Sequence, residues 1–156
     1  MTMLLTGIGS RPFQAQEIGA GSPTLKGINA VYVVVEQLSE SARALGLEAR
    51  SIQTDVELKL VQAGMNVVQQ EEGKKLPGRP FLYIRITVTK SGDAAYVGVE
   101  LDQDTMLERN NQRALSVATW DTGTISAHPT DLIISGVVKG DVDEFLKAWR
   151  SVNSQK

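Results

Sequence analysis

The amino-acid sequence predicts an α+β domain: a single, mostly antiparallel sheet of four to five strands with two to three helices packed on one face. Three observations lead to this fold class. An apolar strand at 30–35 precedes two segments of helical spacing, two strands with alternating apolar residues follow at 81–89 and 97–101, and an amphipathic segment covers 131–152. Helices grouped around a run of antiparallel strands are typical of α+β folds.

The first half of the domain begins with a buried strand. Residues 30–35 are Ala-Val-Tyr-Val-Val-Val, and such a β-branched run favours a strand that is covered on both faces. Ser39 and Ser41 can cap a short helix that ends at Gly46. Ser51 can likewise cap a second helix that ends at Gly64. We therefore expect a central strand followed by a helix pair.

The next two strands form a hairpin whose apolar residues must share one face. Residues 81–89 and 97–101 each alternate apolar and other side chains. The tightest connection is a two-residue turn at 92–93, with glycine first as a type II′ turn prefers. This register would set Arg85 opposite Glu100.

The remaining elements complete the sheet and cover it. Residues 66–68 can start a short strand, and the polar stretch 69–80 is typical of a surface loop. A third long strand is expected at 115–122. Apolar residues at helical spacing over 131–152 predict a helix that packs one stripe against the sheet.

Residues 1–27 differ from the rest of the chain. They are rich in glycine and show neither helical nor strand periodicity, so we expect a flexible leader before a single domain at 28–153. An intact signal peptide is not recognisable, because the apolar residues 3–5 are followed at once by Thr-Gly.

Composition excludes several classes of function. The 156 residues include 16 basic and 18 acidic side chains, a net charge of −2, which argues against nucleic acid as a partner. With 42% hydrophobic residues and no long apolar run, we expect no membrane span. There is no Cys and a single His, so thiolate and paired-imidazole sites are absent, and we expect neither a metal nor another cofactor.

The candidate binding surface is the polar and aromatic face of the hairpin. Aromatic residues and arginine are favoured in the energetically dominant positions of interfaces. An alternative is that the chain's own leader or a loop covers this face. The residues of the candidate surface are Phe81, Tyr83, Arg85, Tyr96, Glu100 and Asp102.

Acidic residues on the second hairpin strand offer a competing hypothesis. Glu100, Asp102 and Asp104 alternate along the strand and would lie about 6.6–7 Å apart on one face. A hard cation could bridge two of them, but calcium sites draw six to eight oxygens from a curved loop. Pairing with Arg85 also accounts for Glu100, so we prefer a solvated strand face.

A hydrolase is a further alternative. Asp121-Thr122-Gly123 resembles the Asp-Thr-Gly triplet of aspartic proteases, in which two such carboxylates share a proton. A second Asp121 would have to come from a homodimer, and His128 could serve as a lone base. The plainer interpretation of the triplet is a turn at the strand end that uses Gly123.

A resemblance is carried by several segments: 53–58, 80–84, 99–101, 118–123 and the tail 142–153. Together they resemble a family of small exported bacterial proteins of unknown function. The resemblance brings no established activity or catalytic residues, but it implies a periplasmic or exported location. At the level of fold, the element order is also similar to envelope modules such as the amino-terminal domain of TolB.

These observations favour a non-enzymatic binding or assembly module of the bacterial envelope over an enzyme. It would hold a protein partner or associate with itself, and a homodimer is one form of this. Gly136 and Gly140, spaced by four in the last helix, predict close packing by another backbone, from the sheet or a second subunit. The alternatives are a small-ligand carrier with an apolar pocket between sheet and helices, or a hydrolase that uses Asp121.

Overall fold

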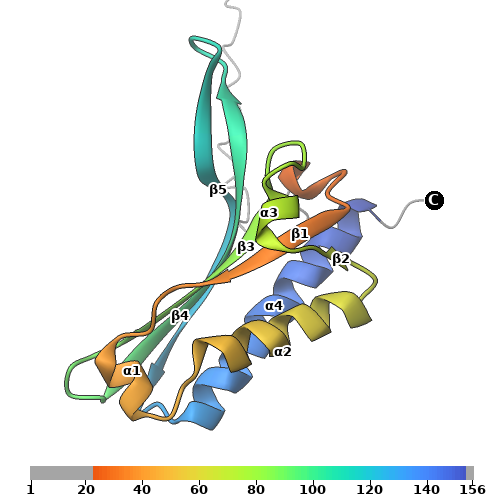
Figure 1. Cartoon of the computed structure of the whole chain (residues 1–156). Coiled ribbons are helices and arrows are strands. Elements are labelled where there is room, and N and C mark those ends of the chain that lie inside the picture. Colours follow the sequence, from red (N-terminus) through yellow and green to blue (C-terminus); the bar gives the residue numbers. More distant parts are fainter. Residues whose placement is uncertain (1–22, 154–156) are drawn as a thin grey trace, which may run out of the picture.

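The computed structural model describes residues 23–153 and confirms the α+β fold class (Figure 1). A five-stranded sheet has the order β2-β1-β3-β4-β5, in which β1 runs parallel to both of its neighbours and the other pairs are antiparallel. The elements are η1 (Pro23–Leu25), β1 (Ala30–Val35), α1 (Glu40–Ala44), α2 (Ala49–Gln62), β2 (Asn66–Val67), α3 (Gln70–Gly73), β3 (Phe81–Val88), β4 (Ala94–Leu107), β5 (Gln112–Ala127) and α4 (Asp131–Asn153).

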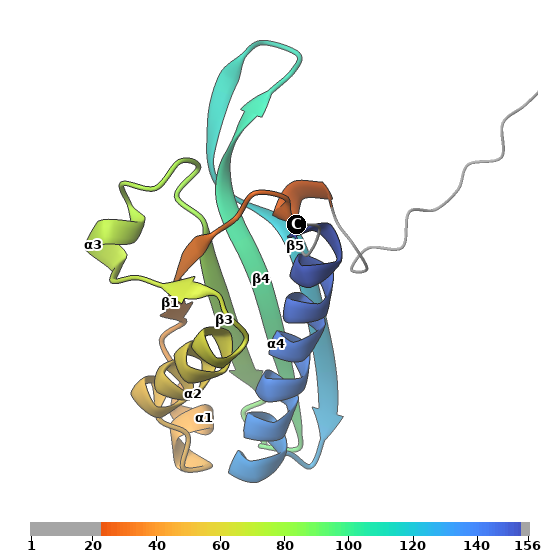
Figure 2. The ribbon, with the colours of Figure 1, turned by 90° about the vertical axis from the view of Figure 1, so that its right-hand side faces the viewer.

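The long helices α2 and α4 cover one face of the sheet, here called the inner face (Figure 2). Leu82, Ile84 and Ile86 of β3 point into the core beneath them, and Phe145 of α4 is fully buried there. The short helix α3 lies on the opposite, outer face, where Gly73 touches the ring of Tyr32. Alternation along β3 therefore separates a packed face from one that α3 covers in part among the residues that the structure describes.

The N-terminal caps of the helices agree only partly with those predicted from the sequence. The Ser39 hydroxyl accepts a hydrogen bond from the Ala42 amide at 3.2 Å, so Ser39 caps α1 as predicted. The predicted cap of α2 at Ser51 is wrong, because the helix begins two residues earlier and Glu48 at its cap makes no side-chain capping bond.

The predicted hairpin register is wrong by two residues. Arg85 stands opposite Gly98, and Glu100 stands opposite Tyr83. The cause is a wider loop over 90–93, in which the Asp93 carboxylate accepts hydrogen bonds from the hydroxyls of Thr89 and Ser91, both at 2.6 Å. A shift of two keeps every side chain on its predicted face.

The strand β5 runs well beyond its predicted end. Asp121-Thr122-Gly123 lies in mid-strand, so the turn expected at Gly123 is wrong. Gly123 stands opposite Gly98, and the Tyr96 ring lies across both; a Cβ at Gly123 would come within 2.5 Å of the Tyr96 hydroxyl oxygen. Glycine is required here because the ring occupies the place of a side chain.

Past the N-terminal end of β3, where Phe81 pairs with Asp102, the strands β4 and β5 continue as a two-stranded arm (Figure 1). Two register shifts mark its base, between Leu101 and Asp102 and between Gln103 and Thr105. Met106 and Leu115 on the arm are 62% and 59% exposed.

The domain includes five residues that were expected to belong to the leader. Leu25 is fully buried, and the Asn153 side chain binds its carbonyl at 2.9 Å and the Gly27 amide at 2.8 Å. The remaining leader, 1–22, lies outside the described residues. None of the helices in residues 23–153 is long and apolar enough to cross a membrane.

The glycine pair of α4 does not support a close approach within this chain. Gly136 and Gly140 lie on the exposed side of the helix, and a Cβ at either position would meet no atom of residues 23–153 within 4 Å. Of the two neighbours that the sequence left open, the sheet does not pack closely against these glycines, and close packing by a second subunit stays a prediction.

Candidate binding surface on the outer sheet face

All six residues of the predicted surface lie on the outer face. They fall on two neighbouring strands, and the register sets Tyr83 opposite Glu100 and Phe81 opposite Asp102. Tyr96 stands apart from the others, over the two glycines at the loop end of the sheet. From β3 come Phe81, Tyr83 and Arg85, and from β4 come Tyr96, Glu100 and Asp102.

Arg85 is the centre of an ionic network on this face. Its guanidinium lies 3.3 Å from a Glu100 carboxylate oxygen, 3.9 Å from a Glu36 carboxylate oxygen and 5.7 Å from the centre of the Tyr83 ring. Burial raises the pKa of Tyr83, and a hydrogen bond with Glu36 raises it further. The sequence analysis missed Glu36; strand alternation from Tyr32 through Val34 would have placed it on this face.

Asp102 is the least satisfied group of the surface. Its Oδ1 atom is buried and has no hydrogen-bond partner within residues 23–153. Burial, with a smaller contribution from Glu100, raises the pKa of Asp102 to about 6, although Arg85 acts in the opposite direction. An ionised carboxylate held in this way costs stability.

Asp102→Asn is therefore expected to stabilise the protein at neutral and higher pH. The folded protein keeps the Asp102 proton up to a pKa of about 6, above the usual 3.8, so wild-type stability falls as pH rises between these values. Because the carboxyl group is partly exposed, we expect a gain of about 1 kcal/mol above pH ~7. Urea unfolding across this pH range measures it; a gain that persists below pH ~4 would contradict the explanation.

An aromatic row continues the surface toward α3. The rings of Tyr32 and Phe81 stack with their centres 5.1 Å apart, and Phe81 meets Tyr83 edge-on at 6.4 Å. Burial raises the pKa of Tyr32. The helix α3 thus covers one end of the row and leaves Tyr83 half-exposed.

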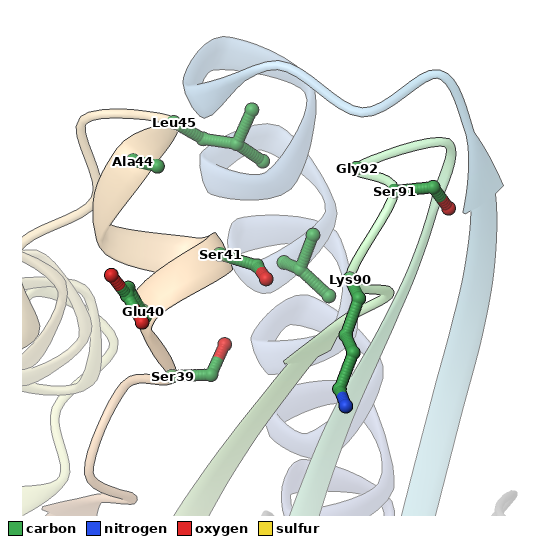
Figure 3. Close-up of a pocket in the computed structure, with 9 residues that line it drawn as sticks. Ser39, Glu40, Ser41, Ala44, Leu45, Lys90, Ser91 and Gly92 are labelled. Atoms are coloured by element: carbon green, nitrogen blue, oxygen red, sulfur yellow. The ribbon is translucent and has the colours of Figure 1, made fainter.

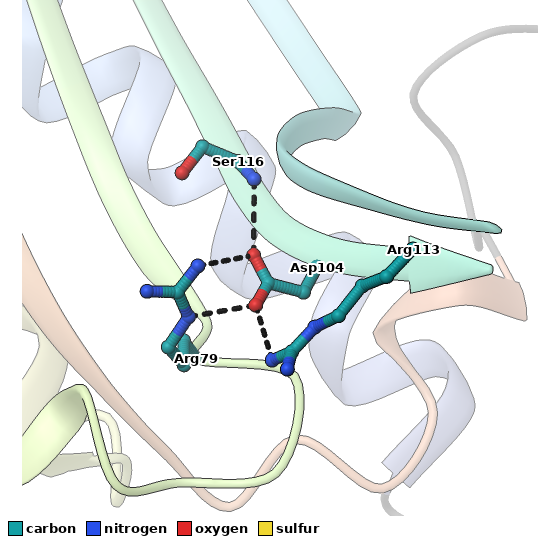
Figure 4. Close-up of polar contacts among 4 residues, drawn as sticks. All are labelled: Arg79, Asp104, Arg113 and Ser116. Carbon is teal, nitrogen blue, oxygen red and sulfur yellow. Dashed lines mark hydrogen bonds and ion pairs between the residues drawn. The ribbon is translucent and has the colours of Figure 1, made fainter.

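The third acid of the predicted ladder, Asp104, belongs to a separate ionic cluster (Figure 4). Its carboxylate accepts two hydrogen bonds from Arg79, at 2.6 and 2.9 Å, a third from Arg113 and a fourth from the Ser116 amide at 3.0 Å. The Arg79 hydrogen bonds lower the pKa of Asp104 to about 2. Its oxygens are therefore occupied, and residues 23–153 hold no group of three His, Cys, Asp or Glu side chains arranged to bind a metal.

The residues of the hydrolase hypothesis lie far apart in this chain. Asp121 is exposed on β5, and His128 follows the end of that strand, where its amide donates to the Asp93 carbonyl at 2.7 Å. Seven residues of extended chain span about 23 Å. The register instead places Asp121 opposite Glu100.

A recess lies at the loop end of the molecule, between α1 and the β3–β4 loop (Figure 3). It has a volume of about 810 Å³. The small-ligand carrier alternative instead expected an apolar pocket between the sheet and the helices. A hollow between α2 and α4 measures only about 30 Å³. The recess is lined by Ser39, Glu40, Ser41, Ala44, Leu45, Val88, Lys90, Ser91 and Gly92.

The fold and this surface define an α+β domain with the long helices α2 and α4 on one sheet face and an acidic and aromatic face, partly covered by α3, on the other. No family model and no curated protein matches the chain, so the resemblance to exported bacterial proteins stays a prediction. Among solved structures, the chain is similar to a variant PelC dodecamer from Paraburkholderia phytofirmans, with 14% identity, coverage of 86% of this chain and 93% of that one, and a TM-score of 0.45. A second PelC dodecamer from the same organism has 15% identity, coverage of 77% and 87%, and a TM-score of 0.40.

Proposed function

We propose that the protein is a non-enzymatic binding module that holds a protein partner on its outer sheet face, and that the docking segment of the partner carries basic side chains. The observation that carries this proposal is the buried, unpartnered carboxylate oxygen of Asp102 beside open aromatic rings. An unsatisfied buried acceptor is costly in the unbound protein, and a cationic donor would relieve that cost.

The charge of the face supports a basic ligand. Around Arg85 the sheet presents the carboxylates of Glu36, Glu100, Asp102 and Asp121, so negative charge is in excess. Complementary charge steers partners and selects between them. A lysine or arginine that approaches Asp102 would also come near the Phe81 ring, which stands opposite Asp102 on the neighbouring strand, and aromatic rings attract cations.

The location of the module is inferred from sequence alone. The resemblance to small exported bacterial proteins supports a location in the bacterial envelope.

Selection from a random peptide library tests the proposal. We expect the enriched peptides to contain Lys or Arg, and the best peptide to bind Asp102→Asn and Tyr83→Ala at least about tenfold more weakly than wild type, a loss of about 1.4 kcal/mol. Calorimetric titration of that peptide measures the loss. Glu108→Gln is the matched control, because it removes a carboxylate from the exposed arm loop and should leave affinity unchanged.

Two results would overturn this function. One is enrichment of peptides without basic residues, and the other is equal binding by the outer-face variants. Tyr83→Ala is expected to stay folded, because Tyr83 is half-exposed and packs against no core residue of the inner face. Urea unfolding of each variant separates lost binding from lost folding.

A further inference from the structure

The strand β5 forms one edge of the sheet. The Thr24 hydroxyl donates to the Thr119 carbonyl at 2.9 Å, but no strand within residues 23–153 pairs with the outer side of β5 at 121–127. Exposed edges attract further strands, and proteins usually protect them with lysine, proline, bulges or a covering segment. The straight part of this edge, 121–127, contains no Lys and no Pro, and Asp121 is its only charged residue.

Strand alternation shows which backbone groups point outward. The Thr89 amide donates to the Ala94 carbonyl at 3.0 Å, so even-numbered residues of β4 bond toward β3 and odd-numbered ones bond toward β5. The odd-numbered residues of β4 stand opposite even-numbered residues of β5, as Val97 does opposite Thr124. The residues of β5 whose amides and carbonyls face outward are therefore Asp121, Gly123, Ile125 and Ala127.

We propose that this edge pairs antiparallel with the same edge of a second copy of the chain, centred on Thr124. Asp121 then stands opposite Ala127 of the second copy, so like charges do not meet. Ile125, which is 78% exposed, stands opposite Gly123 of the second copy. The Tyr96 ring lies over that glycine, so the Ile125 side chain would pack beside an aromatic ring across the two strands.

The helix above the edge supports a second copy as the occupant. Ile133, Val137 and Asp141 follow one another at a spacing of four on α4, so they form one row. The Thr124 hydroxyl donates to Asp141 Oδ1 at 3.1 Å, which places this row along β5. Ile133 is 44% exposed, and a twofold axis through the sheet would set two such helix flanks on the same face of a continuous ten-stranded sheet.

Amide hydrogen exchange followed by NMR tests this pairing residue by residue. We expect protection of the Gly123 and Ile125 amides to rise with protein concentration, in step with dimer formation in sedimentation. The Thr122 and Thr124 amides bond within the chain and should be protected at all concentrations. A protein that stays monomeric, or a dimer whose Gly123 and Ile125 amides exchange freely, would overturn the proposal.

Two variants make the test specific. Ile125→Pro removes an outward amide without removing a bond to β4, and Ile125→Lys adds a charge to the edge, so both should be monomeric. Leu58→Lys makes the same apolar-to-basic change on exposed α2 and should dimerise like wild type. Dimers that persist in both edge variants would contradict β5 pairing. The proposed function is tested separately, by peptide binding to the outer face, so the two proposals can fail independently.

Discussion

Phe145→Ala should lower the free energy of unfolding by about 3–5 kcal/mol. Phe145 is fully buried on α4, and its ring meets Trp120 of β5 edge-on with the ring centres 5.3 Å apart. Truncation removes apolar area from the core and leaves a cavity between helix and sheet that a rigid strand cannot close. Urea unfolding monitored by tryptophan fluorescence and by circular dichroism measures the loss.

Leu132→Ala is the matched control for this experiment. Leu132 lies on the same helix but is 80% exposed, so its truncation should change stability by less than about 0.5 kcal/mol. Similar losses in the two variants would contradict the assignment of Phe145 to the centre of the core.

Asp104→Asn is expected to have the second largest effect, a loss of about 2–3 kcal/mol at neutral pH. The Asp104 side chain is only 3% exposed and joins the loop before β3 to both strands of the arm through Arg79, Arg113 and Ser116. Asparagine cannot accept the same set of charged donors. The loss stays moderate because both guanidinium groups can reach solvent.

The effect of Asp104 depends on pH in a defined direction. Its pKa falls from the usual 3.8 to about 2 in the folded protein, so its stabilisation is present above pH ~4 and is lost as the pH falls through about 2. The unfolding free energies of wild type and Asp104→Asn should therefore converge at low pH. Asp121→Asn, an exposed change on the same sheet, serves as the control and should follow wild type throughout.

Hydrogen exchange distinguishes a local from a global role of Asp104. Because its contacts lie at the base of the arm, we expect Asp104→Asn to increase exchange in 105–117 before it affects β1 and β3. Equal loss of protection across the sheet would show that the cluster stabilises the whole domain and does not act on the arm alone.

The sequence predicted which side chains of the hairpin share a face, but it did not predict the pairing register of the two strands. Side chains alternate with a fixed period, so Tyr83, Arg85 and Glu100 were correctly assigned to one face. The pairing of Arg85 with Gly98 depends on a loop that hydroxyl groups hold open around Asp93. Such a loop competes closely with a tight turn, and hydrophobic pattern cannot decide between registers that differ by two.

The details of the candidate site depend on contacts between distant segments. Arg79 and Asp104 are 25 residues apart, and nothing in the local pattern separates Asp104 from Asp102. In the structure one carboxylate has four donors while the other retains an unpartnered oxygen. Strand alternation could predict that both acids share a face, but only the tertiary arrangement assigns them opposite electrostatic roles.

The contacts of Asn153 have a consequence for chain connectivity. This one amide side chain binds Leu25 and Gly27, so the first and last elements of the domain meet at the same corner. A short linker between them would close the domain into a ring, and the chain could then be opened at 108–111, in the loop at the tip of the arm. Such a circular permutant would keep every strand pairing and would turn the two strands of the arm into the new termini.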